Sequence, residues 1–190
     1  MNTTIQQAIT ILKEGGIVIF PTDTAFGIGC RIDCKEAVDR LFRIRKRPLT
    51  QPTPVLTSSI EQILPYLETP SDIVRRFMQT HWPGALTIIT PCKKELVYSP
   101  IRGGGDTIGI RMPDHHDLLD VITKVGVPIL GPSANMHGEK TPFHVSELDL
   151  ALVNLVDYVL PGACKNHDVS TVIDCTKEPY TVVRQGAIRV

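Results

Sequence analysis

The stretch GGIVIFPTDTAFGIGC, residues 15–30, is the part of the sequence around which the rest of the chain is organised. Its four apolar residues, 17–20, predict a buried strand because the run is short and rich in β-branched side chains. Pro21 ends the pairing, since proline has no N–H to offer a ladder, and three short polar side chains follow at 22–24. A strand that delivers such groups to a glycine-rich bend at 27–29 predicts a small-molecule site. A strand followed by a hydrogen-bonded turn explains the same residues equally well.

Length and composition favour one globular domain over residues 1–190, because 190 residues with 42% hydrophobic content can bury a sizeable core. Lys plus Arg balance Asp plus Glu at 20 each, which disfavours a protein whose main task is to coat nucleic acid. No apolar run approaches the roughly 18–20 residues of a membrane helix, and the N-terminus lacks the features of a signal peptide. We therefore expect a cytoplasmic protein with no membrane partner. The five irregularly spaced cysteines predict reduced, mostly buried thiols and not a zinc site.

Hydrophobic periodicity predicts interleaved helices and strands along the rest of the chain. Helices are expected at 5–12, 34–47, 59–67, 71–82 and 117–125 and from 146 onward, and further strands at 85–90, 107–111, 127–130, 157–160, 170–174 and 180–184. Asp33 and Glu36 predict a capping box at the start of the second helix. At least four strands run without a long crossover helix between them, so the predicted fold class is α/β with a mixed sheet.

The end of the second predicted helix is densely basic. Cations there can offset the dipole of the helix C-terminus, but five within eight residues exceed that need: Arg40, Arg43, Arg45, Lys46 and Arg47. The cluster predicts an anion site. A solvated basic face is the alternative.

Polar side chains also recur at the ends of the predicted strands. They are Thr22 to Thr24, Arg111, Ser133 with Asn135, Ser170 with Thr171, and Arg184. Guanidinium groups suit carboxylates and phosphates, while hydroxyl and amide groups orient a polar ligand. The set therefore predicts a ligand that carries both a carboxylate and phosphates. No general base stands out, which suits a reaction driven by positioning and charge stabilisation.

Several well-known catalytic templates are absent from the sequence. There is no G-x-x-x-x-G-K-[ST] phosphate loop, and the stretch 27–32 lacks the third glycine of a dinucleotide fingerprint. The stretch 131–135 is not G-x-S-x-G, because Asn135 stands in the last position. The six histidines do not fall into metal-ligand spacing, so no metal site formed by the protein is predicted.

Ordered motifs resemble those of the YrdC/YciO family. The stretch PTDTAFGIG at 21–29 is similar to that family's PTxTxYGLG, and WPGALT at 82–87 to its WPGPLT. IRMPDH at 110–115 resembles VRxPxH, and PSAN at 132–135 is found in both. STVID at 170–174 and RQG at 184–186 match the STVxD and RxG endings. The motifs keep the family's order over nearly the whole chain.

This resemblance implies a twisted mixed sheet with helices around a concave, positively charged cavity, and synthesis of threonylcarbamoyl-AMP. The family condenses L-threonine, bicarbonate and ATP, with Mg²⁺ accompanying the triphosphate, and releases pyrophosphate. The product feeds the N6-threonylcarbamoyl modification of adenosine 37 in tRNA, so other tRNA-modification proteins are implied partners. Some members were described as binding double-stranded RNA. The chain length matches the family's short, single-domain form.

Carried over position by position, the resemblance assigns two sets of ligands. Threonine would be held by Thr22, Arg111 and Ser170. The nucleotide would be held by Arg45, Arg47, Thr107, Ser133, Asn135, Thr141 and Arg184.

The chain departs from the family pattern at four positions. Arg45 replaces a lysine, Gln51 a lysine, Phe26 a tyrosine and Leu56 a histidine. These departures, together with the sequences RIRKRP at 43–48 and TVIDCT at 171–176, also resemble the YciO branch of the family. The alternative is therefore a YciO-type paralogue that binds RNA or nucleotide without the synthase activity.

Overall fold

The computed structural model describes residues 3–190, so the first two residues of the expected 1–190 domain lie outside the described residues. The described chain forms two mixed sheets instead of the single sheet expected from the sequence. One has three strands in the order β2-β1-β7, and the other has six in the order β6-β3-β5-β4-β8-β9. Backbone bonds join them, among them one from Ile28 N to Pro132 O at 2.9 Å and one from Leu130 N to Cys30 O at 2.8 Å.

The six-stranded sheet supplies most of the polar strand ends. Strands β3 and β5 are parallel, and β4 runs antiparallel to β5. Strand β8 is parallel to β4, and β9 returns antiparallel to β8 at the sheet edge. The ends of β3, β5 and β9 therefore meet the starts of β4 and β8 along one edge. The strands span β3 Val55–Leu56, β4 Leu86–Pro91, β5 Thr107–Arg111, β6 Ile129–Leu130, β8 Thr171–Asp174 and β9 Thr181–Arg184.

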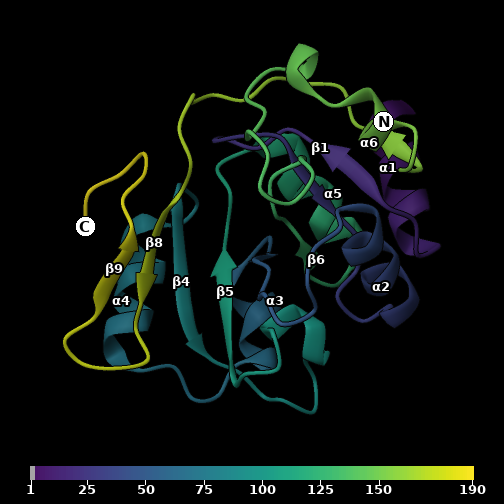
Figure 1. Cartoon of the computed structure of the whole chain (residues 1–190). Helices are drawn as coiled ribbons and strands as arrows, with labels where there is room; N and C mark the ends of the chain where they lie inside the picture. The colour runs from purple at the N-terminus through teal and green to yellow at the C-terminus, as the bar shows by residue number, and fades with distance from the viewer. Residues whose placement is uncertain (1–2) are drawn as a thin grey trace.

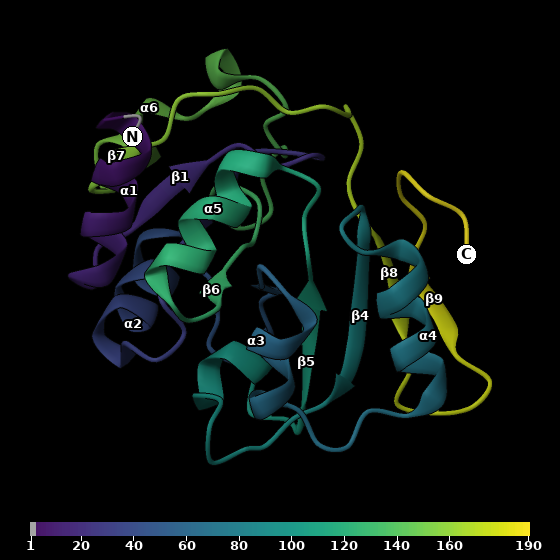
Figure 2. The same ribbon diagram turned by 180° about the vertical axis from the view of Figure 1, so that it is seen from behind.

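Helices cover one face of this sheet. Figure 2 shows α3, α4 and α5 in front of it, whereas Figure 1 shows β4 and β5 from the opposite face, with no helix over them. Helix α5 also packs against α1 beside the smaller sheet. The long helices match the predicted ones within one or two residues, except that α2 ends three residues before the predicted position 47. They are α1 Thr3–Lys13, α2 Lys35–Ile44, α4 Asp72–His81 and α5 His116–Val125, while α3 Ile60–Ile63 and α6 Leu150–Val153 are short. Three 3-10 turns complete the set, at η1 Leu64–Tyr66, η2 Ser99–Arg102 and η3 Val145–Glu147.

The stretch that opened the sequence analysis forms a hairpin in the smaller sheet. Strand β1, Val18–Phe20, pairs antiparallel with β2, Gly27–Gly29, and parallel with β7, Tyr158–Val159. The predicted bend at 27–29 is therefore wrong, and the connection turns at 21–26 instead. Glycine is needed at 29 for close packing, because a Cβ there would lie 1.9 Å from the carbonyl oxygen of Leu130.

The predicted capping box of α2 is also wrong. The N-cap is Cys34, which makes no side-chain cap bond. The Asp33 carboxylate is held instead by Arg31, at 2.8 Å from Nε and 2.7 Å from Nη2. The sequence pattern predicts that the Asp33 carboxylate caps the helix, but this carboxylate accepts bonds from the guanidinium of Arg31 instead.

Helix α2 ends in a Schellman motif. Arg45 is the C-cap, Arg47 N bonds Phe42 O at 2.9 Å, and Lys46 N bonds Arg43 O at 3.1 Å. Lys46 adopts the left-handed conformation, with φ of 53°, at the position where glycine is usual. The motif reverses the chain after the helix, and both Arg45 and Arg47 reach the same pocket.

Replacing Lys46 with glycine is expected to stabilise the protein. The side chain is exposed, and a non-glycine residue in the left-handed region costs about 1–2 kcal/mol, partly offset by the greater freedom of glycine in the unfolded chain. We expect a net gain of about 0.5–1 kcal/mol, or about 1–4 °C in Tm, measured by thermal melts. Lys46→Ala keeps the Cβ and is the control. A Tm of Lys46→Gly no higher than that of Lys46→Ala would show that the left-handed conformation of Lys46 is not strained.

Three of the five cysteines are buried, the other two are half-buried, and all five are free thiols, as predicted. Among residues 3–190, no helix has both the length and the apolar character needed to cross a membrane.

Candidate functional site

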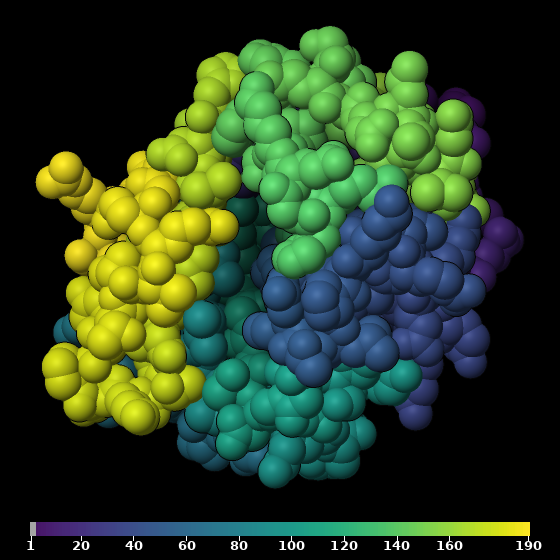
Figure 3. Space-filling model, viewed as in Figure 1, coloured from purple at the N-terminus to yellow at the C-terminus, as the bar shows by residue number. Residues whose placement is uncertain are grey.

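A pocket of about 200 Å³ opens along the strand-end edge of the six-stranded sheet. Figure 3 shows the hollow between the yellow C-terminal segment and the green and blue segments. Its wall comes from the 21–26 loop, the end of α2, the ends of β3 and β5, the segment after β6, the two residues before β8, and strands β4 and β9. Eight of the ten residues proposed from the sequence line it: Thr22, Arg45, Arg47, Arg111, Ser133, Thr141, Ser170 and Arg184. The structure thus brings side chains from separate strand ends together at one pocket.

The 21–26 loop forms one side of the pocket and is tied to Arg111. The Thr22 hydroxyl accepts from Thr24 N at 3.0 Å and donates to the carbonyl oxygen of Ala25 at 2.8 Å. Arg111 donates to Thr24 Oγ1 at 2.7 Å and to the Asp23 carboxylate. Both members of this ion pair are buried, with side chains 7% and 3% exposed. Burial lowers the pKa of Arg111, and the Asp23 carboxylate partly offsets that effect.

A second cluster joins β4, β8 and β9 beside Arg111. The hydroxyls of Thr87 and Ser170 lie 2.9 Å apart. Arg184 donates to Ser170 through Nη2, at 3.0 Å to the hydroxyl and 2.8 Å to the carbonyl oxygen. Burial lowers the pKa of Arg184. These bonds link Ser170, which the resemblance assigns to threonine binding, with Arg184, which it assigns to nucleotide binding.

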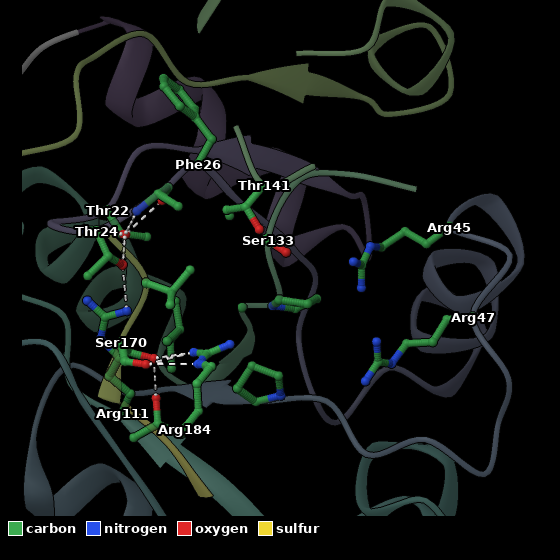
Figure 4. A pocket seen from close by; sticks show the side chains of 18 residues that line it. Thr22, Thr24, Phe26, Arg45, Arg47, Arg111, Ser133, Thr141, Ser170 and Arg184 are labelled. Carbon is green, nitrogen blue, oxygen red and sulfur yellow. Dashed lines mark hydrogen bonds between the residues drawn. The ribbon is translucent and has the colours of Figure 1, made fainter. Parts of the chain in front are cut away.

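Arg45 and Arg47 enter the pocket from the side opposite Arg111 and Ser170, as Figure 4 shows. Arg45 is 3% exposed and donates to Asn135, through Nε to the carbonyl oxygen at 2.9 Å. Its Nη1 is buried without a hydrogen-bond partner among the described residues. Burial and the nearby charge of Arg47 lower the pKa of Arg45 to about 10, so it remains a cation at neutral pH. A buried, incompletely paired cation is costly unless an anion joins it.

The Arg47 side chain is half-buried, although a cation at the end of a basic helix is usually exposed. Its Nε donates to Gln51 O at 3.2 Å and its Nη2 to Pro52 O at 2.5 Å, and burial lowers its pKa. These bonds tie the Arg47 side chain to the loop that follows the helix. The predicted anion site is supported over the solvated face, since Arg45 is buried and both guanidinium groups face the pocket.

The remaining proposed residues divide into two groups. Ser133 and Thr141 line the pocket, and Asn135 lies behind the wall, where its Oδ1 accepts from Ser133 Oγ at 2.6 Å. Thr107 begins β5 and pairs with Pro91, at the end of the strand away from Arg111. The structure does not bring Thr107 to the pocket.

Sequence reasoning missed Thr87 and the pairing of Asp23 with Arg111. It noted Leu56 only as a departure from the family pattern. Thr87 faces the pocket from inside a motif that was quoted only for its resemblance, and Asp23 is the buried partner of Arg111. Leu56 also lines the pocket, directly opposite Arg111 in the β3–β5 register. Thr87 lies inside the predicted strand 85–90 and inside β4, so a search for polar residues at strand ends does not select it.

The lining suits an anionic ligand. It contains four arginines, and none of the described lining residues is acidic. No group of three or more His, Cys, Asp or Glu residues within 3–190 could hold a metal ion. The residues that line the pocket therefore offer no carboxylate ligand for a cation.

Comparisons with known proteins agree with this architecture. The chain is 34% identical over 188 residues to a protein of Bacillus subtilis named threonylcarbamoyl-AMP synthase, covering 97% of this chain and 54% of that protein. It superposes with a TM-score of 0.88 on Pyrococcus abyssi Sua5 complexed with L-threonine, at 32% identity, covering 96% of this chain and 54% of that one. It also matches Escherichia coli YciO with a TM-score of 0.85 at 29% identity, covering 96% and 88%.

The chain thus spans about half the length of the B. subtilis and P. abyssi proteins. The family model Sua5/YciO/YrdC, described as telomere recombination, matches residues 10–186. With the predicted mixed α/β fold present and the ordered motifs gathered at one pocket, the chain belongs to the Sua5/YciO/YrdC family.

Proposed function

We propose that this chain is an L-threonylcarbamoyladenylate synthase. It joins L-threonine, bicarbonate and ATP into threonylcarbamoyl-AMP and releases pyrophosphate and water. The observation that carries the proposal is the pocket itself, in which buried Arg45 presents an unpaired guanidinium nitrogen opposite the Arg111 and Ser170 cluster. Similarity to relatives of that name, and to a Sua5 structure with L-threonine bound, supports it.

The proposed roles follow from charge and position. Arg111 and Ser170 orient the threonine carboxylate and amino group, with Thr22 beside them. Arg45 and Arg47 bind the triphosphate from the opposite side, and Arg184, Ser133 and Thr141 complete the nucleotide subsite. This arrangement holds the carbamate formed from threonine and bicarbonate near the α-phosphate of ATP. The arginines stabilise the charge that develops as pyrophosphate leaves.

The lining holds no titratable acid or base besides its arginines among the described residues. The protein therefore contributes position and positive charge, and the substrates supply the nucleophile. Mg²⁺ enters with ATP and screens its phosphates. Other tRNA-modification proteins in the cytoplasm then transfer the threonylcarbamoyl group from this product to tRNA.

Pyrophosphate release tests this function. Purified protein with Mg²⁺ and ATP is expected to release pyrophosphate only when L-threonine and bicarbonate are both present. Each omission serves as a control, as does heat-inactivated protein. Release that is independent of threonine would contradict the proposal.

A second candidate is a YciO-type protein that binds RNA or nucleotide without the synthase reaction. Leu56 favours it, because this side chain presents an apolar surface beside Arg111 where the resemblance leads one to expect a histidine. It predicts binding of labelled double-stranded RNA that weakens as salt rises, with weak or absent ATP binding. Cooperative binding of ATP and threonine would exclude it.

A further inference from the structure

Strand β9 carries Arg184 although it is the least buried strand of its sheet. All four of its residues are exposed, and it lies at the free edge, as Figure 1 shows. Edge strands fray readily because they are paired on one side only. Nevertheless Arg184 reaches the pocket and makes three donor contacts to Ser170. Something beyond the β8–β9 ladder must fix its direction.

A β-bulge re-aims the strand at this point. Ile173 pairs with Val182, but Val172 pairs with Arg184, so Val183 is an extra residue. Bulges redirect side chains at sheet edges and next to sites. The bulge leaves the residues after it without a regular ladder, so their anchorage must come from elsewhere.

Thr171 supplies this anchorage. It is fully buried at the start of β8, next to Ser170. Its hydroxyl donates to Ile188 O and accepts from Gly186 N at 3.0 Å. One side chain thereby satisfies backbone groups on both sides of the bend that follows Arg184.

Gly186 lets the tail approach close enough for these bonds. A Cβ at this position would lie 2.2 Å from Val169 O and 2.6 Å from the carbonyl carbon of Ser170. These atoms are backbone and cannot rotate away. The next residue continues the contact, with Ala187 N donating to Val169 O at 2.9 Å.

We propose that Thr171 and Gly186 are positioning residues of the nucleotide subsite: they clamp the 185–188 tail onto the 169–171 backbone, which fixes Arg184 on Ser170 and aims it into the pocket. Neither residue lines the pocket, so neither touches the ligand. The proposal rests on the proposed function only in naming ATP as the ligand.

The test compares Thr171→Val with Thr171→Ser, which keeps the hydroxyl. Thr80→Val is the matched control, because its hydroxyl bonds Arg76 O on the exposed side of α4. Calorimetric titration at a temperature well below every melt measures Mg·ATP binding, and a separate titration measures L-threonine without nucleotide. Amide hydrogen exchange at 186–188 reports the tail directly.

For Thr171→Val we expect faster exchange at 186–188, where the two bonds of the hydroxyl are lost. We also expect about tenfold weaker ATP binding, equivalent to the loss of one contact between Arg184 and the nucleotide. Threonine binding is expected to stay within about twofold, since β8 remains paired with β4. Thr171→Ser and Thr80→Val should match the wild type. Gly186→Ala, which keeps the hydroxyl but blocks the approach, should reproduce the ATP loss.

Three results would overturn the inference. The first is equal ATP affinity for Thr171→Val and wild type. The second is a parallel fall of ATP and threonine affinity with no recovery in Thr171→Ser, which indicates a general structural defect. The third is unchanged exchange at 186–188. A wild-type protein that binds no ATP would instead refute the proposed function, and the exchange data would still decide the clamp.

Discussion

Arg111→Ala is expected to lower the free energy of unfolding by about 3–5 kcal/mol, because it leaves the buried Asp23 carboxylate without its partner. It also removes the donors to Thr24 Oγ1 and to the Gly84 carbonyl at 3.0 Å. Threonine binding should disappear with it. Urea unfolding monitored by circular dichroism measures the first effect, and calorimetry at low temperature the second.

A double variant separates the two roles of Arg111. In Asp23→Leu/Arg111→Met, neither charge is left buried, so about half or more of the lost stability should return. Threonine binding should remain absent, because the guanidinium is still missing. The account fails if Arg111→Ala unfolds within about 1 kcal/mol of wild type, or if the double variant binds threonine normally.

Arg45→Met is expected to reduce ATP affinity about ten- to hundred-fold, the value of a charge-assisted interaction of about 1.5–3 kcal/mol. Stability should stay within about 1 kcal/mol of wild type, because the lost bonds to Asn135 are offset by removal of a buried cation. Titration with Mg·ATP beside thermal melts checks both parts.

Arg43→Met is the matched control, since Arg43 lies in the same helix with an exposed side chain that does not line the pocket. It should leave ATP binding unchanged. An equal loss in both variants would mean that the general positive charge of the helix end attracts ATP. Wild-type affinity in Arg45→Met would remove Arg45 from the site.

The fold was largely predictable because local patterns and tertiary packing agree along most of the chain. Strand β5 begins and ends where the pattern of 107–111 predicts, and the ends of the long amphipathic helices differ from the prediction by one to three residues. The split into two sheets was not predictable, because it depends on the Gly29 backbone passing close to Leu130, a contact between distant segments.

The site was predictable where a polar side chain follows an apolar strand, as with Thr22 and Ser133. It was not predictable where the geometry arises from long-range contacts. The Schellman motif at the end of α2 was not predicted because Lys46 stands where glycine is usual. The pairing of Asp23 with Arg111 was not predicted because the two residues lie 88 positions apart. Thr107 shows the opposite case: the resemblance assigns it to the nucleotide, but the residue lies outside the pocket.

The most direct test of the central claim is the fate of carbon from bicarbonate. Protein incubated with Mg·ATP, L-threonine and carbon-13 bicarbonate should yield a nucleotide whose mass equals AMP plus a labelled threonylcarbamoyl group, with pyrophosphate in equal amount. Arg111→Ala should yield none. Absence of this product from the wild-type protein, under conditions where a known synthase forms it, would contradict the account.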